Sequence, residues 1–212
     1  MSRDAIVDAG LAVLREDGLD AVTMRRLASV LRTGPASLYV YFADRDALLE
    51  AMLDRVLAEV PLEAADPGRW RAQVHSLMDE TVAALLRHPG IARVGLANVP
   101  TAGAALRIRE AMLGALLAGG IAPEAAGGAI DTLPLLALAT AVESGVYAER
   151  GTDLKAERRR ITRAYEALPA DEFPLIARHL DAVLGGGRAD RFSLAVDTFL
   201  DGLTGRGERH RR

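Results

Sequence analysis

The sequence contains no cysteine, and aromatic residues make up only 4% of its 212 residues. The absence of cysteine excludes disulfide bonds, thiolate metal sites and cysteine nucleophiles. Valine, isoleucine and threonine are too sparse for many strands. By contrast, 39 alanines and 31 leucines supply about a third of the chain in two strong helix formers. The composition therefore predicts an all-α fold and argues against a β-sandwich or barrel.

Lysine is almost absent too: 25 of the 26 basic residues are arginine, and only Lys155 is lysine. The formal net charge of −3 gives the whole chain no basic character, which leaves room only for a local nucleic-acid-binding patch. The first residues lack the basic and apolar stretches of a secretory signal. The longest apolar run, residues 133–142, is too short to span a bilayer. These features predict a cytoplasmic protein without a membrane partner.

Glycine, proline and capping residues divide the chain into helices. The predicted helices cover about residues 3–17, 24–31, 35–41, 45–60, 70–87, 91–98, 102–118, 123–150, 153–168, 171–184 and 188–203. A polar stretch at residues 61–68 has the composition of a linker. We therefore expect a helix-turn-helix DNA-binding domain of three helices over residues 1–46, joined through the helix at 45–60 to a helical regulatory and dimerisation domain over residues 61–212.

Residues 22–49 have the pattern of a helix-turn-helix unit followed by a longer helix. Leu27 and Ala28 of the first helix are spaced to face Leu38 and Phe42 across the turn. In such a unit the first helix braces the second, and the N-terminal residues of the second enter the major groove of DNA. The pattern therefore directs the start of the second helix outward.

Positive charge is concentrated on the same stretch. Between Thr23 and Arg45 there are four arginines and one acid, a local charge of +3, whereas residues 1–60 together carry −3. Arg25 and Arg45 bracket the short second helix, where they could pair with phosphates on either side of a groove. The charge pattern therefore favours a DNA-binding surface here.

The stretch resembles the DNA-binding domain of the tetracycline-repressor (TetR) family of transcriptional regulators. The resemblance rests on three ordered motifs, which are Val22-Thr-Met-Arg-Arg-Leu-Ala28, Gly34-Pro-Ala-Ser-Leu-Tyr39 and Tyr41-Phe-Ala-Asp-Arg-Asp-Ala-Leu-Leu49. It covers about residues 3–55, and Arg32 stands where the family often has a glycine in the turn. The resemblance implies a homodimeric repressor that binds double-stranded operator DNA and releases it on binding a small-molecule effector, with no cofactor.

Nine residues are candidate DNA contacts: Thr23, Met24, Arg25, Pro35, Ala36, Ser37, Tyr39, Tyr41 and Arg45. Tyr39 matches a contact position of the family, where its phenol would meet a phosphate or a base edge. Tyr41 could do the same or pack on the fourth helix, and Ser37 could bond DNA or satisfy nearby backbone. Arg25 is favoured as a contact, whereas Arg26 is favoured as a solvated side chain.

The resemblance also implies a ligand pocket in each regulatory domain, walled by the fifth to eighth helices. The candidate contacts are His75, Asn98, Thr140, Glu143 and Tyr147, with Trp70 as an aromatic neighbour. Glu143 interrupts an apolar helix face, so it could meet a polar group of the ligand or form a structural pair at a subunit interface. Because the remaining wall would be aliphatic, we expect a largely apolar effector with a few polar groups.

We expect no metal site, because the four histidines stand apart and form no recognised metal motif. In close relatives of the tetracycline repressor, a histidine helps to hold a magnesium–drug complex. The matching position here is Gly95, and a neighbouring threonine position is Asn98. These differences argue against magnesium-tetracycline as the effector.

Two alternatives from other classes are a helical enzyme and a helical adaptor that does not bind DNA. The sequence has no glycine-rich phosphate loop, Gly-x-Ser-x-Gly element or paired catalytic carboxylates in a recognisable motif, so we expect no enzymatic activity. The local +3 charge and the ordered motifs argue against the adaptor. The helices at 123–150 and 188–203 are the predicted dimer interface, because both are rich in small and apolar residues.

Overall fold

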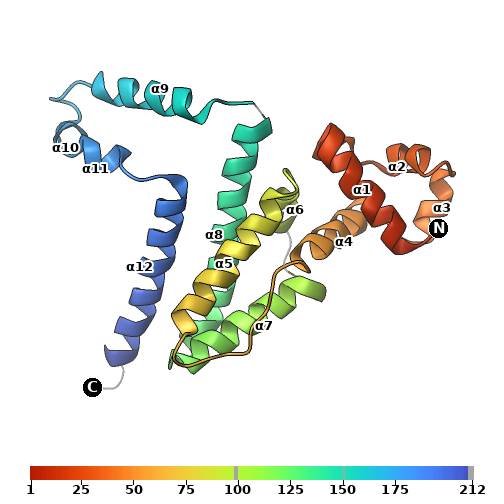
Figure 1. The fold of residues 1–212 in the computed structure, drawn as a ribbon, viewed down its shortest axis with the longest axis horizontal. Helices are drawn as coiled ribbons and strands as arrows, with labels where there is room; N and C mark the ends of the chain where they lie inside the picture. The colour runs from red at the N-terminus through yellow and green to blue at the C-terminus, as the bar shows by residue number, and fades with distance from the viewer. Residues whose placement is uncertain (98–99, 150, 210–212) are drawn as a thin grey trace.

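The computed structural model describes residues 1–97, 100–149 and 151–209, and every regular element within these ranges is a helix (Figure 1). The prediction of an all-α fold is confirmed. The N-terminal helices, red to orange, lie at one end of the molecule, and the longest helices form a bundle beside them. A cyan and blue arm of shorter helices lies at the far end.

The head consists of three α-helices and one 3-10 turn, which are α1 (Arg3–Asp17), η1 (Leu19–Ala21), α2 (Met24–Val30) and α3 (Pro35–Tyr39). It is followed by α4 (Arg45–Leu57). Ser2, Thr23 and Asp44 cap α1, α2 and α4, because each side-chain oxygen accepts the N–H three residues later at 3.2, 3.1 and 2.8 Å. Such caps satisfy backbone donors that the helix itself leaves unpaired, and these starts agree with those predicted.

The body begins with four helices, α5 (Trp70–Leu86), α6 (Ala92–Ala97), α7 (Gly103–Ala118) and α8 (Pro123–Glu149). The central one is α8, which packs against α5, α6 and α7 and buries Leu133 and Ala137 completely. By length and composition alone, residues 123–147 could also cross a membrane. In this structure 28% of the most apolar stretch of α8 is buried, and the helix contacts α5, α6, α7 and α12.

Helix α4 lies between the two parts, since it packs against α1 in the head and against α5, α6 and α7 in the body. The linker that follows it is fixed by Gln73, which is 5% exposed. The Gln73 amide donates to the Ala64 carbonyl at 2.6 Å and accepts the Asp66 N–H at 2.9 Å. The connection between head and body is therefore held by packing as well as by the chain.

The arm comprises α9 (Leu154–Glu166), α10 (Pro174–Arg178) and α11 (Leu180–Leu184). None of the described residues of these helices is buried. The prediction of one helix over residues 171–184 is wrong. The first helix begins at Pro174, a favoured first position because proline has no N–H to leave unpaired. It ends at Arg178, and the next residue, His179, has a φ of −116°.

The last helix, α12 (Arg188–Arg209), runs back along the body and packs against α8 and α5. Val196 and Leu200 are fully buried there. Polar contacts join α12 to α5: Arg71 donates to Asp201 at 2.5 Å, and His75 Nε2 lies 2.9 Å from Asp197 Oδ1. Leu194 is 66% exposed, so α12 also presents an apolar surface to solvent.

Candidate functional site

The turn between α2 and α3 is closed by backbone hydrogen bonds. The N–H of Leu31 donates to Leu27 O at 2.9 Å, and the N–H of Thr33 donates to Ala28 O at 2.9 Å. Arg32 adopts a left-handed conformation with φ of 52°, which is uncommon for a residue other than glycine. The chain thus forms the turn with an arginine where the sequence motif favours glycine.

Helix α3 separates its side chains between the core and solvent. Leu38 is fully buried, whereas Tyr39 is 54% and Val40 is 82% exposed. Pro35 and Ala36 at the start of the helix are exposed, and Ser37 is half-buried. We call the accessible residues at α3, together with one arginine of α2, the recognition surface: Arg25, Pro35, Ala36, Ser37, Tyr39 and Val40. Sequence reasoning missed Val40, although its place between two tyrosines of the motif could have drawn attention to it.

The two adjacent arginines of α2 differ in their partners. Arg26 donates to Asp17 at 2.9 Å, which directs its guanidinium back to the end of α1. Arg25 is exposed and has no hydrogen-bond or ion-pair partner within the described parts of the chain. A free guanidinium at this edge of the recognition surface is available for a phosphate.

Two of the predicted contacts, Met24 and Arg45, have their main contacts within the protein. The side chain of Met24 is 7% exposed and belongs to the head core, so it is not part of the recognition surface. Arg45 donates to Val22 O at 2.6 Å and to Leu19 O at 2.9 Å, because the cap at Asp44 starts α4 directly over this loop. The guanidinium of Arg45 thereby ties α4 to the loop that precedes α2.

The other proposed contacts keep a polar atom near the surface. Thr23 is exposed, although its hydroxyl oxygen caps α2. Tyr41 is half-buried, and its hydroxyl donates to Met1 O at 2.7 Å. Sequence reasoning missed Arg3, which donates to Tyr41 O at 2.8 Å and stacks 4.2 Å from the Phe42 ring centroid. These contacts fix the start of α1 against the end of α3.

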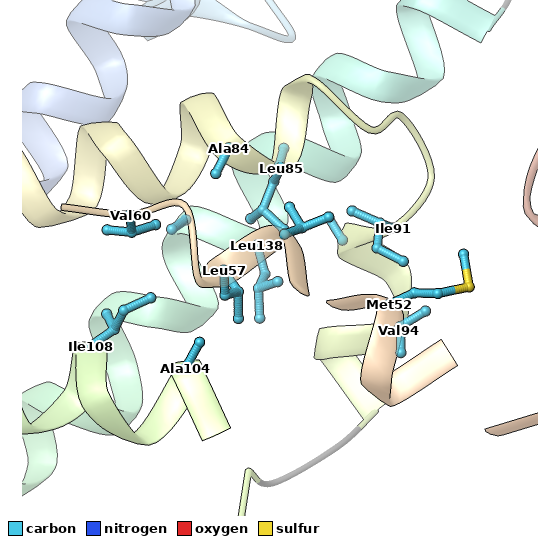
Figure 2. Packing of buried hydrophobic residues seen from close by; sticks show 14 of the residues in the cluster. Met52, Leu57, Val60, Ala84, Leu85, Ile91, Val94, Ala104, Ile108 and Leu138 are labelled. Carbon is cyan, nitrogen blue, oxygen red and sulfur yellow. The ribbon is translucent and has the colours of Figure 1, made fainter. Parts of the chain in front are cut away.

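A cavity of about 520 Å³ lies between the head and the body, and we call it the junction cavity. Its wall is formed by α1 at residues 3–7, α4 at residues 47–58, Thr81, Gly95, the segment 100–109, and α8 at residues 134–138. Apolar side chains line its floor, among them Leu57, Ile108 and Leu138, which belong to one buried cluster (Figure 2).

Of the predicted ligand contacts that lie within the described residues, none lines this cavity. His75 and Glu143 instead face α12, since Glu143 accepts from Arg191 at 3.0 Å. Thr140 and Tyr147 are half-buried, and Asn98 lies outside the described residues. Trp70 packs against Gly119, where a β-carbon would overlap the indole ring. The assignment of these residues as ligand contacts therefore stays a prediction, and two of them, His75 and Glu143, are paired with residues of α12.

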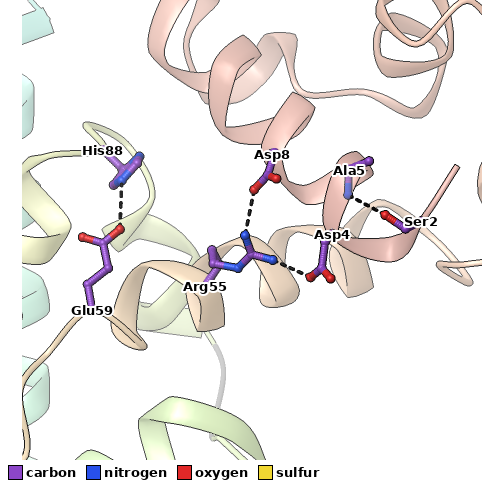
Figure 3. Close-up of polar contacts among 7 residues, drawn as sticks. All are labelled: Ser2, Asp4, Ala5, Asp8, Arg55, Glu59 and His88. Carbon is purple, nitrogen blue, oxygen red and sulfur yellow. Dashed lines mark hydrogen bonds and ion pairs between the residues drawn. The ribbon is translucent and has the colours of Figure 1, made fainter.

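Charged groups gather at the rim of the junction cavity. Arg55 of α4 donates to Asp8 at 2.8 Å and also to Asp4, both in α1 (Figure 3). Asp54 accepts the backbone N–H of Ala104 at the start of α7. Glu50 is exposed at the same rim. The cavity thus combines an apolar floor with a polar mouth, a combination typical of small-molecule sites.

A single histidine lies at the seam between head and body. His88 follows α5, and its Nε2 is 3.8 Å from Glu59 Oε1 (Figure 3). Its Nδ1 is buried without a hydrogen-bond partner. Every other buried side-chain nitrogen or oxygen of the described residues has one. Burial lowers the pKa of His88, with Arg15 and Arg87 acting in the same direction and Glu59 against them. The imidazole is therefore kept neutral at neutral pH.

Comparison with known families assigns both parts of the chain. Residues 6–52 match the family described as Bacterial regulatory proteins, tetR family, and residues 62–206 match the family described as Tetracyclin repressor-like, C-terminal domain. The chain belongs to the tetR family of bacterial regulatory proteins. The resemblance seen in the helix-turn-helix motifs is thereby confirmed, and this tetR-family protein is a ligand-responsive, DNA-binding transcriptional repressor.

Relatives and solved structures agree with this assignment. The HTH-type transcriptional repressor DrrR1 of Streptomyces coeruleorubidus is 29% identical over 96% of this chain and 77% of its own length. An HTH-type transcriptional regulator of Saccharopolyspora erythraea is 32% identical over 89% and 79%. The ActR–actinorhodin complex from Streptomyces coelicolor has a TM-score of 0.88, 30% identity and 98% coverage of both chains. These relatives are regulators, which argues against the alternative of an enzyme.

In the tetR-family fold of this chain, Gly95 lies close against a side chain of α8. A β-carbon built on Gly95 would overlap Leu138 of α8, so the wall of the junction cavity is backbone at this point. Within the described residues, no group of three histidine, aspartate or glutamate side chains is placed to hold a metal ion. At the position matched to a metal-binding histidine in the tetracycline repressors, this chain thus has a glycine packed against Leu138.

Proposed function

We propose that the protein represses transcription as a homodimer whose two recognition surfaces bind successive half-sites of an operator. The observation that carries this proposal is the exposed surface at α3, where Tyr39 and Val40 are turned to solvent. Beside them is the guanidinium of Arg25, which has no partner among the described residues. Arg25 would bind a phosphate, while Tyr39 and the residues at the start of α3 would meet base edges in the major groove.

The domain boundaries follow from this division of labour. Residues 1–46 act as the DNA-binding domain, α4 connects, and residues 61–212 regulate and dimerise. Arg45 and Met24 support the head from within, so they are left out of the contact set. Thr23, Pro35, Ala36, Ser37 and Tyr41 remain in it.

The second copy would pack on α8 and α12. A groove between these helices is lined by small and apolar residues such as Gly128, Ala195 and Phe199, and Leu194 beside them is 66% exposed. A two-fold dimer fixes the distance between its two heads, and a repressor needs that distance to match the spacing of the half-sites. The protein would act in the cytoplasm, without a membrane partner.

The effector would bind in the junction cavity. ActR has been solved in complex with actinorhodin and with (S)-DNPA, and its overall fold is that of this chain. The cavity has a volume within the range of small-molecule sites and an apolar floor, so it suits a largely apolar molecule with polar groups at its edge. Because α1 and α4 contribute to its wall, an occupant would touch the head directly.

The first test is an operator-binding titration on the DNA that flanks the gene, with salt as a variable. Arg25→Ala should weaken binding to every sequence and reduce the slope of log affinity against log salt by about 1, as expected for one lost phosphate contact. Arg26→Ala is the matched control, because Arg26 is already paired with Asp17. Equal binding by wild type, Arg25→Ala and Tyr39→Ala, with all three folded, would contradict the proposed surface.

A further inference from the structure

Helix α7 is capped by a residue from another helix. Its own N-cap residue, Ala102, has no side chain that can accept a hydrogen bond. Asp54, near the end of α4, accepts the N–H of Ala104 instead. A carboxylate at this place satisfies a free backbone donor and interacts favourably with the helix dipole. We call this hydrogen bond the Asp54 cap.

Gly103 is shaped to admit that carboxylate. Its φ is +76°, a conformation that residues with a side chain rarely adopt, and a β-carbon built on it would overlap the Asp54 carboxyl group. Both properties make glycine the residue that fits at this position. The close approach of α4 to α7 therefore depends on two residues about fifty positions apart in the sequence.

Arg55, the next residue along α4, contacts the head. Arg55 pairs with Asp4 and Asp8 of α1, so two consecutive residues of α4 bind the body on one side and the head on the other. Asp54 and Arg55 both line the junction cavity, as does the segment 100–103 that leads into α7. A molecule that displaces this segment would move the donor of the cap, the N–H of Ala104, away from Asp54.

We propose that the Asp54 cap fixes the head in its operator-binding position, and that an occupant of the junction cavity breaks it. The inference rests on the proposed function, because it assigns the means by which that cavity controls the head. With the cap formed, α4 has one position relative to α7, and the two heads of a dimer have one spacing. Without it, the spacing varies, and ordering the heads on the operator costs additional free energy.

The first experiment measures operator affinity in the absence of effector by fluorescence anisotropy. Asp54→Ala and Gly103→Ala should each weaken binding at least about fivefold, the lower end of typical allosteric coupling. Gly120→Ala is the matched control, since Gly120 has nearly the same φ of +79° but nothing within 4 Å of its β-carbon. It should lower stability without lowering affinity. Wild-type affinity in folded, dimeric Asp54→Ala and Gly103→Ala would overturn the proposal.

The second experiment uses a covalent occupant, which the absence of native cysteine makes specific. Leu135→Cys places a thiol in the cavity wall, and Leu117→Cys places a control thiol on α7 outside it. A bulky maleimide attached at position 135 should weaken operator binding by the protein that retains Asp54. In the Asp54→Ala background the same label should weaken binding little further. An equal loss in both backgrounds would overturn the cap as the route while leaving the cavity as the regulatory site.

A label at position 135 without effect in either background would overturn both the cap and the cavity as a regulatory site. The DNA-binding part of the proposed function is judged separately, by Arg25→Ala and its control. A folded protein that binds operator through Arg25 but ignores the label and the loss of Asp54 is therefore distinguishable from one that does not bind operator at all.

Discussion

The recognition surface takes its side chains from one stretch, residues 25–40, whereas the junction cavity takes its wall from α1, α4, α5, α6, α7 and α8. The surface therefore follows from local structure: a capped helix, a tight turn and a proline at the start of α3. The cavity follows only from how distant helices pack. Substitutions that affect only stability, only DNA binding or only the cavity can test this difference.

The largest effect is expected in the core beneath the recognition surface. Leu38→Ala removes a fully buried side chain and should lower the free energy of unfolding by about 2–5 kcal/mol. Val40→Ala, two residues later and 82% exposed, should change it by less than about 0.5 kcal/mol. Urea unfolding followed by circular dichroism measures both. Equal destabilisation by the two changes would mean that α3 does not divide its side chains in this way.

Arg45 and Arg25 should give opposite results. Arg45→Ala removes the donors to Val22 O and Leu19 O and should cost about 1–3 kcal/mol of stability, while the salt slope of operator binding stays that of wild type. Arg25→Ala should leave stability nearly unchanged and reduce the slope. Chemical denaturation and salt titration of the same preparations test the pair. A reduced salt slope in folded Arg45→Ala would restore Arg45 to the DNA contacts.

Glu143 should matter little to the stability of the protein or to the salt slope of operator binding. Its pair with Arg191 is exposed on both sides, so Glu143→Gln should change the free energy of unfolding by less than about 1 kcal/mol. Leu138→Ala, at the floor of the junction cavity, is the contrasting change and should cost more, since Leu138 is 9% exposed. Thermal unfolding compares them. A large loss in Glu143→Gln would show that the pair has a structural importance its exposure does not suggest.

The smallest effect is a pH dependence from His88. Its pKa in the folded protein lies below the ordinary value of about 6.5 because the ring is buried. As the pH falls through 6.5, the unfolded chain takes up a proton that the folded chain resists, so stability decreases. At a pH well above 6.5 both states are unprotonated, and this residue contributes no pH dependence. The difference in unfolding free energy between wild type and His88→Gln, measured from pH 7.5 to 5, should shrink as acid is added. A constant difference would contradict the assignment.

Much of the head could be predicted from the sequence, because its signals are local. Ser2, Thr23 and Asp44 are caps that act on a residue three positions away, and the alternation of Leu38 with exposed neighbours follows from helical spacing. Arg45 could not be interpreted in this way, since its partners at Leu19 and Val22 come close only once the loop has folded back. From the sequence, Arg45 and Arg25 were both arginines beside the second helix, so both were predicted to contact phosphate.

The cavity lay beyond sequence reasoning for the same reason. His75 and Glu143 attracted attention as polar residues on helices of the predicted wall, but their partners belong to α12, more than forty residues away. Asp54 and Gly103 carry no motif that links them. A glycine before a helix and an acid within another become a functional pair only when α4 crosses the start of α7.

The exposed helices of the arm make this part of the chain the most open to local unfolding and proteolysis. Its helices bury none of their described residues, so separating them from one another exposes little new apolar surface and should require little free energy. The only lysine of the chain, Lys155, lies in α9 and is exposed. A lysine-specific endoprotease should therefore cut the native protein once, within the arm, and leave α12 held to α5 by Asp197 and Asp201.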